Sequence, residues 1–408
     1  MSAEGPTGER RRRPNPSLPN AWKWGFPVLA AVVAAWGAIL LLGGLTTILD
    51  SQRGETREAV TDPSAAGFEA FVEQTWSMLV ATEDESGELV EVAVVAASDR
   101  SGGGGTVLLI PVEASVSEGV TGVSAGCEAE CRLVDQYRNG GLDAVRMATA
   151  KILDVQFTGA TLLTPARWES LAGAVDAVSV VLEDDLVATA VDGTSVIRFP
   201  AGIVAVAAAD VVDLLGFASA GDDGSLVRLD RQGDWWRGWV DALQGGNPRD
   251  RLPNLELDVI DLLATVVRGR VRVVVGPWGA DGGGVLAVDA DRLTDLVVEM
   301  FPFPIPRVPG QLLSVRLLNG TGDPALDVPA REAVLRAGVE LAVVGNYRND
   351  GVIQTRVIYR DPEDEASAEA LAAVIGGGVL FDPYLSPVTD LTVVIGIDFV
   401  PRVGVPRG

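Results

Sequence analysis

The stretch LVDQYRNGGLDAVRMATAKILDVQFTGATLLTPARWESLAGAVDAVSVVLEDD, residues 133–185, places the chain in a fold class. Residues 133–155 carry apolar side chains at helical spacing, and the TGATLLTP that follows shortly after them is typical of a strand. PARWESLAGAVDAV predicts a second helix and VSVVLEDD a second strand. Because helices alternate with strands, the sequence predicts a layered α/β domain in which helices pack on a sheet.

Further predicted strands and helices extend this pattern in both directions, so that the domain occupies residues 67–300. The additional strands are Trp76–Thr82, Leu89–Ala97, Val107–Pro111 and 270–276, and the additional helices are 205–217, 230–243 and 255–267. The tetraglycine at 102–105 predicts a hairpin loop. It lacks the Lys-Ser or Lys-Thr of a phosphate-binding loop, which argues against nucleotide binding there.

A proline-rich string separates this domain from a second one. FPFPIPRVPG, residues 301–310, holds four prolines, and we place a semi-rigid linker at 301–311. Beyond it, residues 312–400 read as strand, helix, strand, strand, helix and strand. The order βαββαβ predicts a small α+β sandwich, one sheet covered by two helices, followed by a tail at 401–408.

The composition excludes several chemistries. The 408 residues contain no His and two Cys, so a Ser-His-Asp triad, a His-ligated metal and a four-thiolate cluster are impossible. A hydrophobic fraction of 48% is enough for each domain to bury a core. The formal net charge of -24 argues against a nucleic-acid partner, because phosphate contacts need clustered Lys and Arg.

Residues 24–49 are uncharged and mostly apolar, and about 20 such residues can cross a bilayer as a helix. The basic tail before them, residues 1–23, predicts a cytoplasmic N-terminus, with a polar stalk at 50–66 and the bulk of the chain outside. The alternative, a cleaved signal peptide, would have a shorter apolar run. Because the tail holds five basic and two acidic residues, the rest of the chain carries -27.

Cys127 and Cys131 lie four residues apart in GCEAECRL, on the side of the span predicted to be outside the cell. An oxidising compartment favours a disulfide between them, with the role of a local staple. The alternative is a pair of unrelated buried thiols.

The final domain resembles the LytR C-terminal domain of bacterial envelope proteins. The residues that carry the resemblance are VRLLNGTG (Val315–Gly322), AGVELAVVGN (Ala337–Asn346), TRVIYR (Thr355–Arg360) and LTVVIGID (Leu391–Asp398). They follow one another with family-like spacing across most of residues 312–400. The resemblance implies an accessory or binding module, because no catalytic activity is attributed to that domain as a class.

The central region is similar to the catalytic domain of LytR-CpsA-Psr proteins. Its likeness is carried by VLLIPVEASV (Val107–Val116), the helical stretch at 133–155 and FPAGIVAVAAADVVDLLG at 199–216, which leads to VRLDRQGDWWRGWVDAL. The resemblance implies transfer of a glycopolymer from a polyprenyl pyrophosphate to peptidoglycan. Where the family has an Arg-Asp pair that binds pyrophosphate and magnesium, however, this chain has Val112 and Glu113, and GFASAGDD lacks the family's next arginines. The central domain therefore resembles a degenerate form of that catalytic domain.

Arg228, Arg231 and Gln232 remain of the family's later arginine cluster, and they are the candidate ligand-binding residues for a phosphate or uronate. The alternative is a solvated helix start that pairs with nearby aspartates. The helical stripe Trp235, Trp236 and Trp239 favours a core face over the lining of a lipid or sugar pocket.

Two acidic clusters are weaker candidates for a divalent cation. Glu183–Asp185 follow a predicted strand, whereas Glu363–Glu365 fall in the first turn of a helix, which explains them without a metal. Asn319 fits a turn. Tyr359 and Asp398 have structural roles as their simplest explanation. No residue is assigned as catalytic or as a metal ligand.

The sequence favours a membrane-anchored, outward-facing envelope protein that binds or scaffolds peptidoglycan, polyprenyl-linked glycans or cell-wall enzymes. This role needs no cofactor. The alternative is an active phosphotransferase of the resembled family, which uses magnesium. In it, Arg228 and Arg231 neutralise the leaving pyrophosphate while a carboxylate deprotonates the acceptor hydroxyl.

Overall fold

The computed structural model describes residues 60–116, 131–190, 192–218, 224–244, 246–254, 257–280 and 286–401. They all belong to one compact unit that starts at Val60. The predicted cytoplasmic tail and membrane span lie outside the described residues, as does most of the predicted stalk. No helix within the described ranges is long and apolar enough to cross a membrane.

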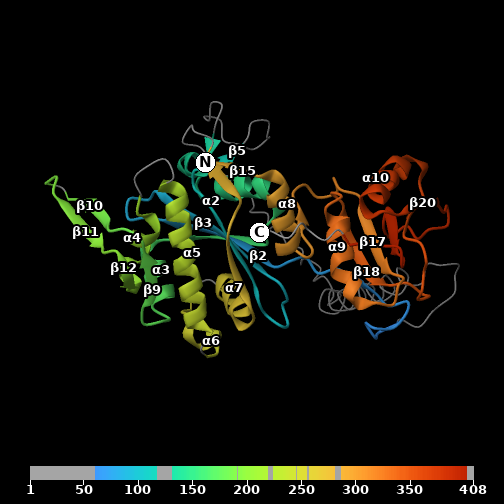
Figure 1. Cartoon of the computed structure of the whole chain (residues 1–408), viewed down its shortest axis with the longest axis horizontal. Helices are drawn as coiled ribbons and strands as arrows, with labels where there is room; N and C mark the ends of the chain where they lie inside the picture. The colour runs from blue at the N-terminus through green and yellow to red at the C-terminus, as the bar shows by residue number, and fades with distance from the viewer. Residues whose placement is uncertain are drawn as a thin grey trace, which may run out of the picture. The chain divides into compact units, whose positions relative to one another are not determined.

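A five-stranded sheet forms the centre of the first domain (Figure 1). Its order is β13-β4-β3-β2-β8, in which β2, β3 and β4 are antiparallel neighbours and β8 and β13 add in parallel at the two edges. The strands are β2 (Ser77–Glu83), β3 (Leu89–Ala97), β4 (Gly105–Ile110), β8 (Gly159–Leu163) and β13 (Val271–Val275). Every residue of β3 is buried, as expected for a strand in the middle of a sheet that is covered on both faces.

The tetraglycine predicted as a hairpin loop connects β3 to β4 as expected. Gly103 has a φ of 78°, a conformation that residues with a Cβ rarely adopt. A Cβ on Gly105 would lie 2.2 Å from the carbonyl oxygen of Ala96. Close approach of two backbones therefore requires glycine at this position.

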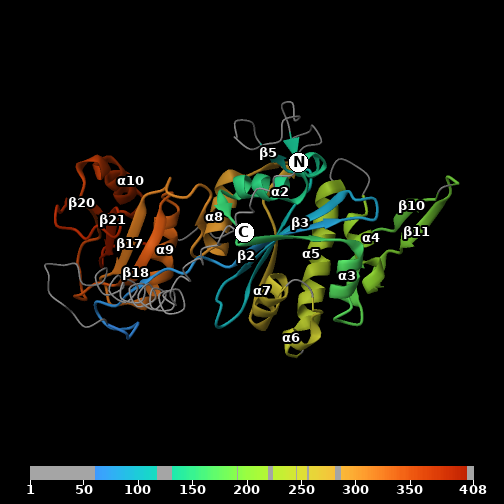
Figure 2. The same ribbon diagram turned by 180° about the vertical axis from the view of Figure 1, so that it is seen from behind.

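Seven helices are described in the first domain, several of them close to their predicted positions. They are α2 (Leu133–Leu153), α3 (Pro165–Ala172), α4 (Val211–Gly216), α5 (Gly224–Leu243), α6 (Pro248–Arg251), α7 (Leu257–Arg268) and α8 (Ala290–Met300). Figure 2 shows the same elements from behind, with α2 above the central strands and α7 below them in both views. The start of α3 is fixed by Thr164, whose side chain accepts a hydrogen bond from the backbone of Arg167.

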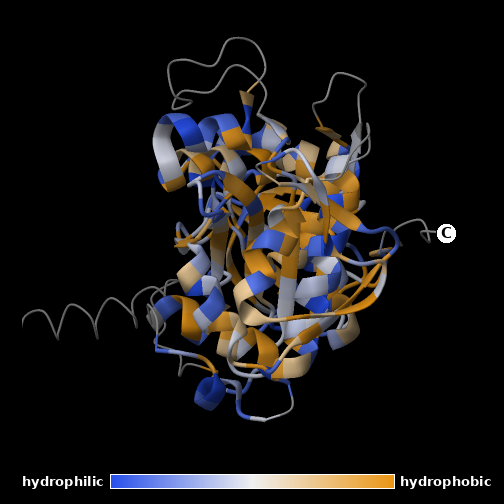
Figure 3. Ribbon diagram, turned by 90° about the vertical axis from the view of Figure 1, so that its left-hand side faces the viewer, coloured by the Kyte–Doolittle hydropathy of each residue, from blue (hydrophilic) through white to orange (hydrophobic). Residues whose placement is uncertain are grey.

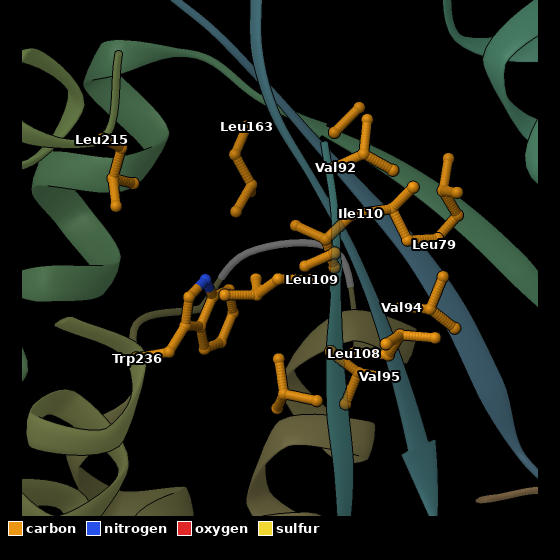
Figure 4. Packing of buried hydrophobic residues seen from close by; sticks show 14 of the residues in the cluster. Leu79, Val92, Val94, Val95, Leu108, Leu109, Ile110, Leu163, Leu215 and Trp236 are labelled. Carbon is orange, nitrogen blue, oxygen red and sulfur yellow. The ribbon is translucent and has the colours of Figure 1, made fainter. Parts of the chain in front are cut away.

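The core lies where these helices meet the sheet. Figure 3 shows the interior strands as mostly hydrophobic and the helices as mixed in character. In Figure 4, Trp236 of α5 points toward Leu109 of β4, and both residues are fully buried. Such packing of large side chains between helix and sheet is what the alternating pattern predicted.

A ribbon of two successive antiparallel strand pairs interrupts the alternating pattern between α3 and α4. In the first pair β9 (Val178–Leu182) lies beside β12 (Gly202–Val206), and in the second β10 (Leu186–Thr189) lies beside β11 (Ser195–Phe199). The predicted helix at 205–217 was therefore wrong in its first part. Residues 205 and 206 complete β12 because they pair with β9, and only Val211–Gly216 is α-helical.

The second domain is built on a six-stranded sheet with the order β1-β18-β17-β21-β19-β20. Its strands are β1 (Glu69–Phe71), β17 (Ser314–Asn319), β18 (Glu340–Asn346), β19 (Arg356–Tyr359), β20 (Gly378–Phe381) and β21 (Leu391–Ile395). The helices α9 (Asp327–Leu335) and α10 (Glu365–Ile375) share one buried cluster with β17, β18, β19 and β21. The predicted βαββαβ order is present, with the extra strand β20 after α10.

The strand β1 departs from the predicted domain boundary at residue 67. Glu69–Phe71 pairs with β18 and so belongs to the second sheet, although it precedes the first domain in the chain. An unpaired β18 would expose a row of backbone donors and acceptors, which β1 covers. The side chains of Glu69 and Arg316 form an ion pair across this sheet.

The predicted linker is packed against the first domain. Phe301 is 1% exposed, and β16 (Ile305–Pro306) pairs with β7 (Val155–Gln156). The Arg307 guanidinium lies 2.9 Å from the Asp154 carboxylate. The remaining short strands are β5 (Ser115–Val116), β6 (Cys131–Arg132), β14 (Trp278–Ala280) and β15 (Leu286–Val288).

Candidate functional site

Arg228 lies in the second turn of α5, next to the end of β4. Its guanidinium forms an ion pair with the side chain of Glu113, which follows Pro111 by two residues in the sequence. The two side chains are 13% and 18% exposed. The charge of Arg228, the candidate arginine nearer the surface, is thus neutralised by Glu113.

Arg231 is 5% exposed and points to the end of α4. Its Nε donates to the Leu214 carbonyl over 3.0 Å, and its Nη2 donates to the Phe217 carbonyl. A cation is favourable at a helix C-terminus, where backbone carbonyls lack helical partners. Burial, together with the charge of Arg228, lowers the pKa of Arg231 from 12.5 to about 10, so the side chain stays charged near neutral pH.

Gln232 is 2% exposed and has an equally structural environment. Its Nε2 donates to the carbonyl oxygens of Val90 (3.0 Å) and Leu215 (2.8 Å). The side chain therefore joins α5 to β3 and to α4. Sequence reasoning grouped Arg228, Arg231 and Gln232 as one ligand site, but the structure brings only Arg228 near the surface.

The predicted tryptophan stripe forms the centre of the core. Trp235, Trp236 and Trp239 are at most 1% exposed, and Trp168 of α3 joins them. The ring centroid of Trp168 lies 4.9 Å from that of Trp235 in an edge-to-face contact. Such aromatic pairs add to the free energy gained from burial. The core interpretation is therefore supported over a ligand pocket.

Glu91 is a buried acid that sequence reasoning missed. It is the third residue of β3, is fully buried, and accepts hydrogen bonds of 2.8 Å from Trp236 Nε1 and from Thr82 Oγ1. Trp168 Nε1 donates in turn to Thr82 Oγ1. Burial raises the pKa of Glu91 from 4.5 to about 7, against the lowering effect of the two hydrogen bonds. The sequence feature that could have revealed this buried acid is a single Glu in an otherwise apolar strand, LVEVAVVAA.

A magnesium ion does not fit the residues around Arg228. Glu113 Oε2 is buried and has no hydrogen-bond partner among the described residues. One carboxylate oxygen beside a guanidinium is far from the octahedral oxygen shell that magnesium requires. Across the described parts of the chain, no group of three potential ligands could hold a metal, and this includes Glu183–Asp185 and Glu363–Glu365.

The remaining candidates have structural roles in the described residues. Asn319 Oδ1 accepts from the Thr321 backbone over 2.9 Å in a turn, and Asp398 Oδ1 accepts from the Thr355 backbone over 2.7 Å. The Tyr359 ring packs on Phe381. Cys131 is disulfide-bonded, but Cys127 lies outside the described residues, so its pairing with Cys131 remains a prediction.

A surface depression lies away from these residues, at the C-terminal ends of α5 and α7. It has a volume of about 600 Å³ and is lined by Gln244, Val267, Arg268 and Arg270, among others. Two helix C-termini direct carbonyl groups toward this region, which disfavours an anion there. We therefore do not assign this depression as a diphosphate site.

Comparison with known proteins agrees with the sequence prediction for the second domain. Residues 313–399 match the family described as "LytR cell envelope-related transcriptional attenuator". No curated protein matches the chain.

Solved structures similar to the chain cover the larger part of it. TagV from B. subtilis is 15% identical with a TM-score of 0.43, over 56% of this chain and 96% of that one. TagT bound to LIIa-WTA is 17% identical with a TM-score of 0.42, over 61% and 96%. Protein gbs0355 from Streptococcus agalactiae is 13% identical with a TM-score of 0.44, over 56% and 86%. We transfer no residue role at these values. The match at residues 313–399 confirms the predicted LytR C-terminal domain in that part of the chain.

Proposed function

We propose that this protein is a membrane-anchored, extracytoplasmic factor that binds or scaffolds components of cell-wall polymer assembly without catalysing the transfer. The observation that carries this proposal is the state of the predicted site. Arg228 is neutralised by Glu113, while Arg231 donates to the carbonyls of Leu214 and Phe217. A diphosphate would have to displace these partners before the two guanidinium groups were free to bind it.

The LytR C-terminal domain supplies the link to the cell envelope. Peptidoglycan, polyprenyl-linked glycans or wall enzymes are the proposed partners, and no cofactor is required. The predicted span at residues 24–49 and the basic tail before it support anchoring, with the N-terminus in the cytoplasm. The net charge of -27 beyond the tail would repel anionic lipid and keep the outer domains away from the membrane surface.

Binding is tested with the full-length protein in mild detergent. We expect it to sediment with insoluble peptidoglycan and to stay bound when Arg228 is replaced by Ala, because the proposed role does not use this side chain for chemistry. A chain that binds neither peptidoglycan nor a polyprenyl-linked glycan would contradict the proposal.

The topology needs a separate test. An alkaline phosphatase fused to the C-terminus is expected to be active, because that enzyme folds only outside the cytoplasm. An inactive phosphatase, together with a cytoplasmic reporter that works at the same position, would refute the anchored, outward-facing arrangement.

A further inference from the structure

The ribbon formed by β9, β10, β11 and β12 exposes apolar side chains in cross-strand pairs. Val181 lies opposite Ile203, and Val187 lies opposite Ile197. Their exposed fractions are 63% and 79% for the first pair and 46% and 54% for the second. Residues directly opposite on antiparallel strands lie on the same face, so each pair forms a continuous apolar surface. Scattered apolar residues are ordinary on a protein surface, whereas paired ones concentrated on one element need an explanation.

The outer edge of β10 is open. Within the described residues, β10 is hydrogen-bonded to β11 alone, and Figures 1 and 2 both show the two strands extending beyond α4. β10 has the sequence LVAT, with neither the charge nor the proline that commonly protects an edge strand. An extended segment of another chain is therefore able to add to it through backbone hydrogen bonds.

Acidic side chains border this edge. Residues 178–206 contain four acids and one base, Arg198, which is engaged by Asp210 (2.6 Å) and Asp213 (2.8 Å). Glu183 and Asp184 lie just before β10, while Asp185 accepts a hydrogen bond from the Ala201 backbone.

The negative field at this end of the ribbon extends to α5. The pKa of Asp230 is raised, first by burial and then by the charges of Asp234 and Glu183. The carboxylates of Asp234 on α5 and of Glu183 after β9 therefore repel that of Asp230. The positive charge of Arg237 lowers the pKa of Asp230 but only partly offsets this repulsion. A cation brought to this edge would relieve the repulsion.

We propose that this ribbon is the docking surface for an extended, cationic and apolar segment of a partner protein, which adds as a strand to β10. Its branched side chains would cover Val187 and Ile197, and its basic side chains would face Glu183 and Asp184. A second copy of this chain is disfavoured, because its ribbon would bring the same acids. An anionic lipid surface is disfavoured for the same reason.

The test uses the full-length chain and a fluorescent peptide in which lysine and valine alternate, with binding followed by polarisation. The double variant Val187→Thr/Ile197→Thr keeps strand propensity but removes apolar contact, and we expect binding about tenfold weaker. Glu183→Gln/Asp184→Asn leaves the core untouched, and we expect a similar loss that shrinks as salt is added.

A matched control removes two acids elsewhere, in Glu363→Gln/Asp364→Asn, and should bind the peptide as the wild type does. Equal weakening by this control would show general attraction to an acidic protein and overturn the proposal. Self-association of the full chain, or binding to anionic vesicles, that is abolished by Val187→Thr/Ile197→Thr would also overturn it. Each would assign the ribbon to a different occupant.

Discussion

Two arginines three residues apart on helix α5 show how differently neighbouring residues of the same type are used. Near the start of α5, Arg228 lies close to the surface and pairs with Glu113. Three residues further on, Arg231 is buried and donates to carbonyl groups at the end of α4, and the turns beyond it carry three tryptophans of the core. The difference teaches that an arginine cluster in a sequence is a ligand site only if the fold leaves its guanidinium groups without partners.

The same contrast holds for the two acids that α5 contacts. Glu113 has a guanidinium partner, whereas fully buried Glu91 has, among the residues that the structure describes, the Trp236 indole and the Thr82 hydroxyl as its hydrogen-bond donors. Burial disfavours the charged form of a carboxyl group, and a cationic partner favours it. We therefore expect substitutions in the buried part of α5 to cost more stability than substitution of Arg228.

Substitution in the buried part should have the largest effect. Trp236→Ala removes a fully buried ring and a hydrogen bond to Glu91, and we expect a loss of about 3–5 kcal/mol in the free energy of unfolding. Denaturant titration measures this loss. The adjacent Arg237→Ala, at a half-exposed position, should change stability little, and an equal loss in both variants would refute the core assignment.

Ionisation of Glu91 should make the free energy of unfolding depend on pH. Because its pKa rises from 4.5 in the unfolded chain to about 7 in the folded one, the folded state binds the extra proton between these values. Stability from this group is fully present below pH 4.5 and is lost as the pH rises through 7, by about 3 kcal/mol in total.

Unfolding of Glu91→Gln at pH 5 and pH 8 isolates this contribution. The variant should lose less stability than the wild type between the two values, because Gln does not titrate. Glu85→Gln, at an exposed position, serves as the control and should follow the wild type. Identical pH profiles for all three proteins would show that Glu91 is not the titrating group.

Arg231→Met should have an intermediate effect. It leaves the carbonyls of Leu214 and Phe217 without their donor in a buried environment, which costs about 2 kcal/mol. Thermal unfolding measures the change, and peptidoglycan sedimentation of the folded variant should be unaltered. A variant that keeps full stability but no longer binds peptidoglycan would show that Arg231 contacts the ligand.

The smallest effect is expected for the Arg228–Glu113 pair. A double-mutant cycle with Arg228→Ala and Glu113→Gln should give a coupling free energy of about 1 kcal/mol, because the attraction between the two largely buried charges is offset by the cost of removing them from water. A coupling several times larger would show that this pair contributes as much to stability as the buried residues of α5.

Much of the fold was predictable because the local patterns are strong. The bounds Leu89–Ala97 of β3 were predicted correctly, since a long apolar run between polar segments leaves little ambiguity. Residues 205 and 206 were misassigned because Ala and Val suit both helix and strand, and pairing with β9 decides between them. The short strand β20 escaped notice because four residues after a glycine run carry little periodic signal.

The site was less predictable because its contacts come from distant parts of the chain. The spacing of the tryptophans indicated a core face, and the structure agrees. The role of Arg231 depends on carbonyl groups of α4, and that of Gln232 on the backbone of β3, neither of which a local pattern reveals. Tertiary packing, which residue type alone does not reveal, gives these two predicted ligand residues partners within the chain.

The most direct test of a non-catalytic site is an assay of the full-length protein for release of polyprenyl pyrophosphate. The substrate is a lipid-linked glycan, supplied with magnesium and peptidoglycan as the acceptor. We expect no release above the rate without protein, because Arg228 and Arg231 are held by partners within the chain. Release by the wild type that Arg228→Ala abolishes and Arg237→Ala preserves would contradict this conclusion.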